Sequence, residues 1–244
     1  IMFKKILSFI LILTNLNLNL GFFNINIKLS SGKTAIMDGK GPPLLFSSGL
    51  YGTMPRRFYT KLINDLKKNV TVVSIENFNI MEPDDIDNIV DKLRVDSIAF
   101  LSHSSFNPEV LENDKINSAV LLDPICLPKI NFVGITKPYA NIDYPVLIIR
   151  SEKLYNTENP LPEWQEIEIE TSQTITDEIY KDVGHPDILD DSWADIAKNL
   201  GFWTMAEQDI VEFKDWRSNF KTNVPTIRKQ YRKSTSNKIL EFIN

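Results

Sequence analysis

The sequence predicts an α/β fold in which a mostly parallel, doubly wound sheet is flanked by helices. Short apolar runs at 44–47, 70–75 and 98–101 alternate along the chain with amphipathic helical patterns at 55–66 and 83–93. The runs carry apolar residues at successive positions, which is typical of strands buried on both faces of a parallel sheet. The chain has 244 residues, 43% of them apolar, so one large core can be buried in a single domain.

The first 28 residues are expected to be a signal or targeting segment. Lys4 and Lys5 precede the apolar run ILSFILIL, which is too short to span a bilayer as a mature helix. This pattern predicts the secretory route, to a lumenal compartment or to a plastid reached through it. The alternatives are an N-terminal strand and an uncleaved anchor. Residues 29–244 are expected to form the single folded domain.

The segment from 30 to 66 leads the chain into the sheet. Residues 30–43 are rich in glycine and proline, which predicts loops and one short strand before the buried strand at 44–47. Ser48–Gly52 then forms a glycine-containing loop. In a hydrolase the loop after this strand donates a backbone N–H to an oxyanion hole, and Leu50 is the expected donor. The alternative is an ordinary connection into the helix at 55–66, where Pro55 occupies the first turn.

Further elements alternate in the same way. The β-branched run at 70–75 predicts a strand, and Pro83 followed by Asp84 and Asp85 predicts the start of a helix, because acidic residues are favoured in a first turn. The remaining elements are expected as follows: a two-turn helix in 107–115, strands at 116–122, 146–149 and 166–170, helices over 192–201 and 210–220, and a tail helix in 226–244 whose basic residues line a solvated face.

Ser104 is the candidate nucleophile. It follows the apolar strand 98–101 and precedes a helix start at Pro108, which is the order found in the nucleophile elbow of an α/β-hydrolase, where a sharp strand-to-helix turn exposes a serine. The usual pattern is G-x-S-x-G, whereas Ser102 and Phe106 stand at the two glycine positions here. The fold predicted with this elbow is an α/β-hydrolase fold without a large cap domain.

A serine nucleophile needs a histidine base and a carboxylate that orients it. The chain has only two histidines. His103 is adjacent to Ser104 and so points to the opposite side of an extended backbone, which leaves His185 as the base. Asp123 and Glu152 each follow a predicted strand at the same edge of the sheet. Asp123 is the preferred acid and Glu152 the alternative. The backbone N–H groups of Ser105 and Leu50 are the expected oxyanion donors.

Composition excludes other classes of function. The net charge is −5 and the basic residues are spread evenly, whereas a nucleic-acid surface needs a concentrated basic face. Cys126 is the single cysteine, so neither an intramolecular disulfide nor a cysteine-based zinc cluster can form. No cofactor and no metal are expected, and the predicted partner is a small hydrophobic molecule.

Several segments together resemble the chlorophyllase family of α/β-hydrolases. The resemblance covers roughly 42–201. It is carried by LLFSSGLYGTMPRRFYTKLINDL, SIAFLSHSSF, INSAVLLDPI, YPVLIIRSE and, most specifically, VGHPDILDDSWADIA. It implies that Ser104, Asp123 and His185 correspond to the family's nucleophile, acid and base, and that the reaction is hydrolysis of the chlorophyll phytyl ester without a cofactor.

The sequence departs from that family at the elbow and the glycine loop. The family elbow reads G-H-S-R-G-G, whereas Ser102, Ser105 and Phe106 replace the first glycine, the arginine and the next glycine here, and Ser48 stands where the family has histidine. Two functions are therefore expected. One is a serine esterase acting on chlorophyll or a lipid. The other is a hydrolase fold that has lost activity and serves as a structural or binding subunit of a membrane-associated assembly.

Overall fold

The computed structural model describes residues 25–49, 52, 54–75, 81–126, 129–131, 134–152, 166–194 and 224–244. Leu50, most of the predicted targeting segment, most of the helix predicted over 192–201 and all of that at 210–220 lie outside this part of the chain. Ile25–Lys28, the last residues of the predicted targeting segment, form strand β1.

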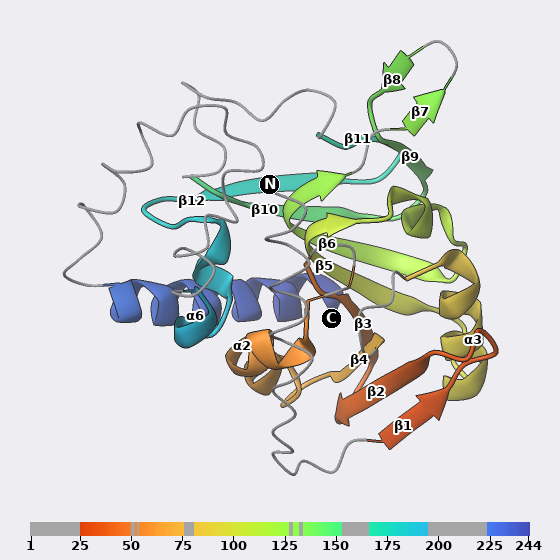
Figure 1. Cartoon of the computed structure of the whole chain (residues 1–244), viewed down its shortest axis with the longest axis horizontal. Helices are drawn as coiled ribbons and strands as arrows, with labels where there is room; N and C mark the ends of the chain where they lie inside the picture. The colour runs from red at the N-terminus through yellow and green to blue at the C-terminus, as the bar shows by residue number, and fades with distance from the viewer. Residues whose placement is uncertain are drawn as a thin grey trace, which may run out of the picture.

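A mostly parallel eight-stranded sheet forms the centre of the described structure (Figure 1). β1 pairs antiparallel with β2, and β2 pairs antiparallel with β4, while the other neighbouring strands run parallel. The strands in spatial order are β1 (Ile25–Lys28), β2 (Thr34–Gly39), β4 (Thr71–Ile75), β3 (Pro43–Ser47), β5 (Ile98–Phe106), β6 (Ile116–Cys126), β10 (Val146–Ser151) and β12 (Ile175–Tyr180).

Alternate side chains of the inner strands β3, β4, β5, β6 and β10 enter two separate cores, one on each face of the sheet. Leu44 packs into one core and Leu45 into the other, and both are fully buried. Leu101 and Phe100 divide in the same way. This explains the continuous apolar runs in the sequence, because a strand covered on both faces has no solvent-facing position.

Helices cover each face. The first core contains residues of η1 (Arg56–Tyr59), α2 (Thr60–Leu66), η4 (His185–Ile188) and α6 (Val224–Ile243), and the second contains residues of α3 (Pro83–Leu93) and η2 (Pro108–Glu112). In Figure 1, α2 and α6 lie on one side of the sheet and α3 lies on the other. α3 begins as predicted, with the Asp85 carboxylate accepting from the Glu82 N–H and ion-pairing with Lys33.

The edge of the sheet differs from the prediction. The predicted strand at 166–170 appears as β11 (Glu168–Thr171), which pairs with β9 (Tyr139–Ile142) outside the central sheet. The last central strand is β12, which the sequence did not predict. Its residues alternate between exposed and half-buried, and Asp177 and Glu178 stand at its centre, so it lacks the apolar run that marks the inner strands. β7 (Lys129–Asn131) and β8 (Gly134–Thr136) form a hairpin that projects from the fold (Figure 1).

Two helical predictions need correction. The expected helix in 107–115 is a short 3-10 turn, η2. The tail does form a helix, α6, but its arginines do not lie on a solvated face. Arg228 and Arg232 are only 1% and 3% exposed. Their buried charges are compensated by hydrogen bonds to acidic side chains and to carbonyl groups around η4.

Candidate active site

Ser104 lies in a sharp local deformation of β5. Its φ of 62° is in the left-handed region, and the pairing of β5 with β6 shifts register between His103 and Ser105. Such a φ is uncommon for a residue with a Cβ and costs free energy that the surrounding structure must offset. The backbone therefore adopts a strained conformation at Ser104 although neither flanking glycine is present.

The chain beyond Ser104 departs from the predicted strand-to-helix turn. Ser105 and Phe106 continue β5 and pair with Ile125 and Cys126 of β6, and η2 begins only at Pro108. Phe106 is 1% exposed and packs with Phe100 in the second core. The bulky side chain at the glycine position is accommodated because no helix starts there.

The predicted nucleophile, base and acid lie in one line of hydrogen bonds. His185 Nε2 is 2.8 Å from Ser104 Oγ, and His185 Nδ1 is 3.1 Å from Asp123 Oδ2. With Asp123 ionised, Nδ1 carries the hydrogen and donates it, so Nε2 is left to accept from the serine hydroxyl. All three side chains are buried. This is the arrangement that serine acyl transfer requires.

Asp123 is the acid that reaches the histidine. It is a buried residue of β6 with a φ of 46°. Its carboxylate accepts from Ser151 twice, from the backbone N–H to Oδ1 at 2.6 Å and from Oγ to Oδ2 at 2.8 Å. The alternative acid, Glu152, accepts instead from the Asp182 N–H at 2.9 Å. The structure thus brings Asp123, and not Glu152, to His185.

The segment that carries His185 is held from α6. Asp187 Oδ2 accepts from the Gly184 N–H at 2.8 Å, and Asp187 Oδ1 accepts from Arg228 Nε at 2.7 Å. Arg232 donates to the Leu189 carbonyl and to Asp191. The turn that carries His185 is therefore held by the Asp187 carboxylate, which belongs to the turn itself, and by Arg228 and Arg232, which belong to α6.

His103, excluded above as the base, does not point away from the site as expected, because its ring stacks on that of His185. Its two nitrogens are engaged by other partners and neither is bonded to Ser104. Its Nδ1 is 2.8 Å from the Tyr59 hydroxyl and its Nε2 is 3.1 Å from the carbonyl oxygen of His185. The two imidazole rings stack with centroids 4.6 Å apart. Burial, and then the nearby His185, hold the pKa of His103 well below 6.5, so this ring is neutral at physiological pH.

One of the two predicted oxyanion donors lies in the described structure. Ser105 immediately follows Ser104, whereas Leu50 lies outside the described residues. The Gly49 N–H donates to Tyr59 Oη at 2.9 Å and is not available to a substrate. The loop around it is folded back on itself, because Gly52 and Met54 donate to the carbonyls of Ser48 and Gly49.

A metal ion bound at this site would compete with the hydrogen bonds of the histidines and of Asp123. In the described residues, His103, Asp123 and His185 are the group whose ligand atoms lie close enough, within 4.8 Å of one another, to share an ion. The nitrogen atoms of both histidines and the carboxylate already have protein partners. A cation here would have to break the line of hydrogen bonds, so the donor set fits acyl transfer better than metal chemistry.

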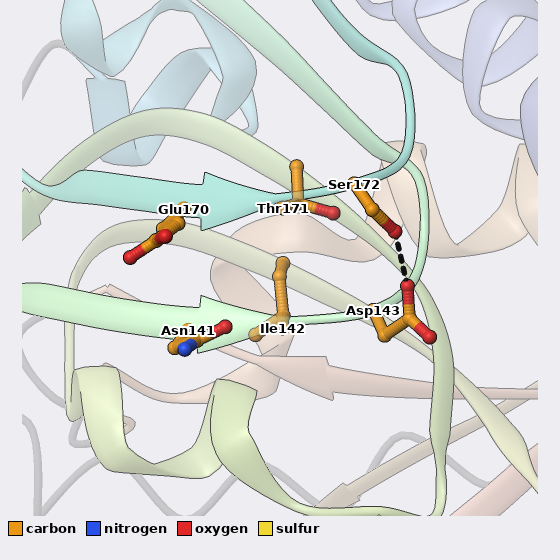
Figure 2. Close-up of a pocket in the computed structure, with 6 residues that line it drawn as sticks. All are labelled: Asn141, Ile142, Asp143, Glu170, Thr171 and Ser172. Atoms are coloured by element: carbon orange, nitrogen blue, oxygen red, sulfur yellow. Dashed lines mark hydrogen bonds between the residues drawn. The ribbon is translucent and has the colours of Figure 1, made fainter.

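A separate pocket lies between β9 and β11 (Figure 2). It is lined by Asn141, Ile142, Asp143, Glu170, Thr171 and Ser172. Figure 2 shows the Ser172 hydroxyl pointing at the Asp143 carboxylate, and the two are 2.5 Å apart. These residues precede β10 and β12, whereas Ser151 is the last residue of β10 and His185 follows β12. The pocket therefore lies at the opposite edge of the sheet from the candidate active site.

No protein-family model matches the chain, and no curated protein matches it. The solved structures that resemble it include the epoxide hydrolase CorEH without ligand, with a TM-score of 0.51, 11% identity and coverage of 74% of this chain and 98% of that one. An epoxide hydrolase from Vigna radiata has a TM-score of 0.48 at 11% identity, with coverage of 74% and 98% respectively. The chain has the α/β-hydrolase fold. At this level of identity the likeness shows the fold alone.

Sequence reasoning missed the residues that support the three principal side chains. Ser151 is the last residue of β10, which pairs with β6, and its place at the shared carboxyl edge of parallel strands was the available signal. Tyr59 was interpreted only as part of an apolar helical stripe. Arg228 gave no signal, because nothing in a basic tail indicates which residue it will contact across the fold.

Proposed function

We propose that this chain is a serine hydrolase that cleaves a hydrophobic carboxylic ester, with Ser104 as nucleophile, His185 as base and Asp123 as the acid that orients it. The observation that carries the proposal is the continuous line from Ser104 Oγ through His185 to Asp123, with distances of 2.8 and 3.1 Å. The left-handed backbone at Ser104 adds support, because strain of this kind is concentrated at functional sites.

In the proposed reaction Ser104 Oγ attacks the ester carbonyl carbon while His185 Nε2 takes the hydroxyl proton. The negative oxygen of the tetrahedral intermediate accepts from the N–H groups of Ser105 and Leu50. The intermediate collapses, the alcohol leaves with the proton from His185, and an acyl group remains on the serine. Water then attacks the acyl carbon with His185 again as base, which releases the acid and restores Ser104.

For the substrate we propose the phytyl ester of chlorophyll or a lipid ester. The sequence resemblance over 42–201 supports this choice, above all the segment VGHPDILDDSWADIA, which contains His185. Incubation with chlorophyll would release chlorophyllide and phytol. Incubation with nitrophenyl esters of increasing acyl length tests a preference for lipids, since a hydrophobic pocket gains affinity with each buried methylene.

One observation favours an inactive scaffold as the second candidate. Ser105 and Phe106 pair with β6, so the N–H of Ser105 does not lie at the start of a helix, where the macrodipole would help to stabilise an oxyanion. In this case the fold would serve as a structural or binding subunit of a membrane-associated assembly. Within the described residues, none of the helices is both long and apolar enough to cross a membrane.

Labelling of the purified protein by a fluorophosphonate separates the two candidates, because the reagent reacts only with an activated serine. We expect labelling of the wild-type protein and its loss in Ser104→Ala and His185→Ala. Ser74→Ala is the matched control, since this serine is also buried in a central strand but lies on β4, and it should label normally. Folded wild-type protein that stays unlabelled would contradict the hydrolase proposal and favour the scaffold.

A further inference from the structure

We propose that His103 and Tyr59 are positioning residues, which hold the His185 backbone and the glycine loop of the expected oxyanion hole in one rigid unit. This inference rests on the proposed hydrolase function. It concerns a chain of buried hydrogen bonds that starts at the Gly49 N–H, passes through the Tyr59 hydroxyl and the His103 ring, and ends at the carbonyl oxygen of His185.

The direction of every bond in this chain follows from its ends. The carbonyl of His185 can only accept, so His103 Nε2 carries the hydrogen and donates it across 3.1 Å. In the neutral ring Nδ1 must then accept, and it does so from the Tyr59 hydroxyl at 2.8 Å. The tyrosine oxygen accepts in turn from the Gly49 N–H at 2.9 Å. Each polar group has the partner it needs.

Because Tyr59 and His103 are buried, only this direction of the hydrogen bonds is favourable. Tyr59 is 0% exposed and His103 is 1% exposed, so water cannot replace a lost partner. A buried donor or acceptor without a partner carries its full desolvation penalty. The bond between Tyr59 and His103 is the one that could be reversed. Its reversal would leave the Nε2 lone pair facing the His185 carbonyl oxygen, while the tyrosine hydroxyl would keep only the weak acceptor Met54 Sδ. The network therefore has one low-energy arrangement, and this property suits it to fix positions.

Gly49, Tyr59, His103 and His185 are also in close van der Waals contact. A Cβ built on Gly49 would lie 3.0 Å from Tyr59 Oη, 2.9 Å from Met54 Sδ and 3.4 Å from His103 Nδ1. The glycine thus lets the loop approach closely enough for its N–H to reach the tyrosine. The Tyr59 ring meets His103 edge-on with centroids 5.5 Å apart, and His103 stacks on His185.

The hydrogen-bond network contacts the backbone of the proposed base at one end and the glycine loop at the other. The carbonyl held by His103 belongs to His185, the proposed base, and Gly49 directly precedes Leu50, the expected oxyanion donor. The network therefore holds the His185 backbone and Gly49 at fixed positions relative to each other. A neutral His103 also leaves the stacked His185 free to accept the serine proton without a second positive charge beside it.

The kinetic test measures the rate of fluorophosphonate labelling in four variants. We expect Tyr59→Phe and His103→Leu to label roughly ten to a hundred times more slowly than wild type, in line with the cost of misplacing reacting groups. His103→Gln keeps an amide donor for the His185 carbonyl and should recover much of the loss. Tyr144→Phe is the matched control, because this buried hydroxyl also donates, to the Leu111 carbonyl, far from the site.

The control separates positioning from stability. Tyr59→Phe and Tyr144→Phe each remove one buried hydroxyl and should lower the melting temperature similarly, but only the first should slow labelling. Equal labelling rates in Tyr59→Phe, His103→Leu and wild type would overturn the inference while leaving the hydrolase proposal intact. Wild-type protein that does not label would overturn the hydrolase proposal, and the catalytic part of this inference with it.

The hydrogen-bond chain has its own readout, independent of activity. The protein contains two histidines, so nitrogen-15 spectra of histidine-labelled protein show two imidazoles, and the His103→Gln variant assigns them. We expect His103 to stay in the neutral Nε2–H form around neutral pH, because its pKa lies well below 6.5, and to lose this tautomer preference in Tyr59→Phe. An Nδ1–H form, or a His103 that titrates around neutral pH, would overturn the inference.

Discussion

Ser104 combines a functional side chain with a backbone conformation that its own Cβ opposes. The left-handed region, where its φ of 62° lies, is costly for any residue other than glycine. The serine is held there by the parallel pairing of β5 on both sides, with β3 and with β6. The backbone conformation alone would favour glycine at this position, so it is the hydroxyl that requires a serine.

We predict that Ser104→Gly is more stable than Ser104→Ala by about 1 kcal/mol, because glycine relieves the positive φ while both variants lose the hydroxyl. Neither variant should label with a fluorophosphonate. Urea unfolding gives the two free energies of unfolding. The same pair at Ser105, which has no positive φ, is the control and should show the opposite order. Equal stabilities at position 104 would argue against strain there.

His103 gives the protein a specific dependence of stability on pH. Its pKa in the folded state lies well below 6.5, first because it is buried and then because His185 is close. Above pH 6.5 the ring is neutral in both states and has no effect. As the pH falls below 6.5, the unfolded chain binds a proton that the folded protein does not, so acid favours unfolding.

The expected result is a free energy of unfolding that falls as the pH drops below 6.5, with a contribution from this residue whose slope approaches about 1.4 kcal/mol per pH unit once the unfolded histidine is protonated and the folded one is not. The measurement is chemical unfolding of wild type and His103→Gln at several pH values, and the difference between the two profiles isolates His103 from the carboxylates. Parallel profiles across this window would show that His103 gains its proton equally easily in both states.

Among the elements, α6 contacts the segment that carries His185 through its arginines. Its Arg228 and the Asp187 of η4 form an ion pair of 2.7 Å in which both side chains are about 1% exposed. Asp187 also accepts from the Gly184 N–H, next to the proposed base. A buried pair of this kind contributes little net stability, but removal of one partner leaves an uncompensated charge in the core.

Arg228→Met should therefore destabilise the protein by about 3–5 kcal/mol and slow labelling at Ser104. The double variant Arg228→Met with Asp187→Asn should recover most of the stability, since the stranded charge is gone. Thermal and urea unfolding of the two single variants and the double variant measure the coupling. Lys238→Met is the control, because its partner Glu178 is partly exposed. Additive losses would contradict a coupled buried pair.

At the scale of the whole molecule, the sheet separates two apolar cores that share the five inner strands, β3, β4, β5, β6 and β10. The first core lies under α2 and α6, and the second lies under α3. Because adjacent residues of one strand enter opposite cores, the two faces cannot loosen independently. The described domain should therefore unfold as one cooperative unit.

Leu44→Ala and Leu45→Ala test this cooperation, since these adjacent residues are both 0% exposed and lie in different cores. Each should lower the free energy of unfolding by about 2–5 kcal/mol and shift the same single transition, followed by both near-UV and far-UV circular dichroism. A transition that splits in one variant only would show that the two cores unfold separately.

The sequence was sufficient to predict the parts of the fold that are buried on both sides. The inner strands and α3 were identified because their apolar patterns are dictated by local geometry, and Ser104, Asp123 and His185 could be placed because parallel strands end at one edge. β12 was missed because an edge strand can be polar. The arginines of α6 were misjudged because their partners lie more than forty residues away along the chain.

The dependence of the His185 segment on α6 also sets an order of assembly during synthesis. Ser104, Asp123 and His185 all leave the ribosome before α6 does. A nascent chain that has just extended past Asp191 carries these three side chains but lacks Arg228 and Arg232, which hold the turn around His185. The candidate active site would therefore reach its final arrangement only after α6 has emerged.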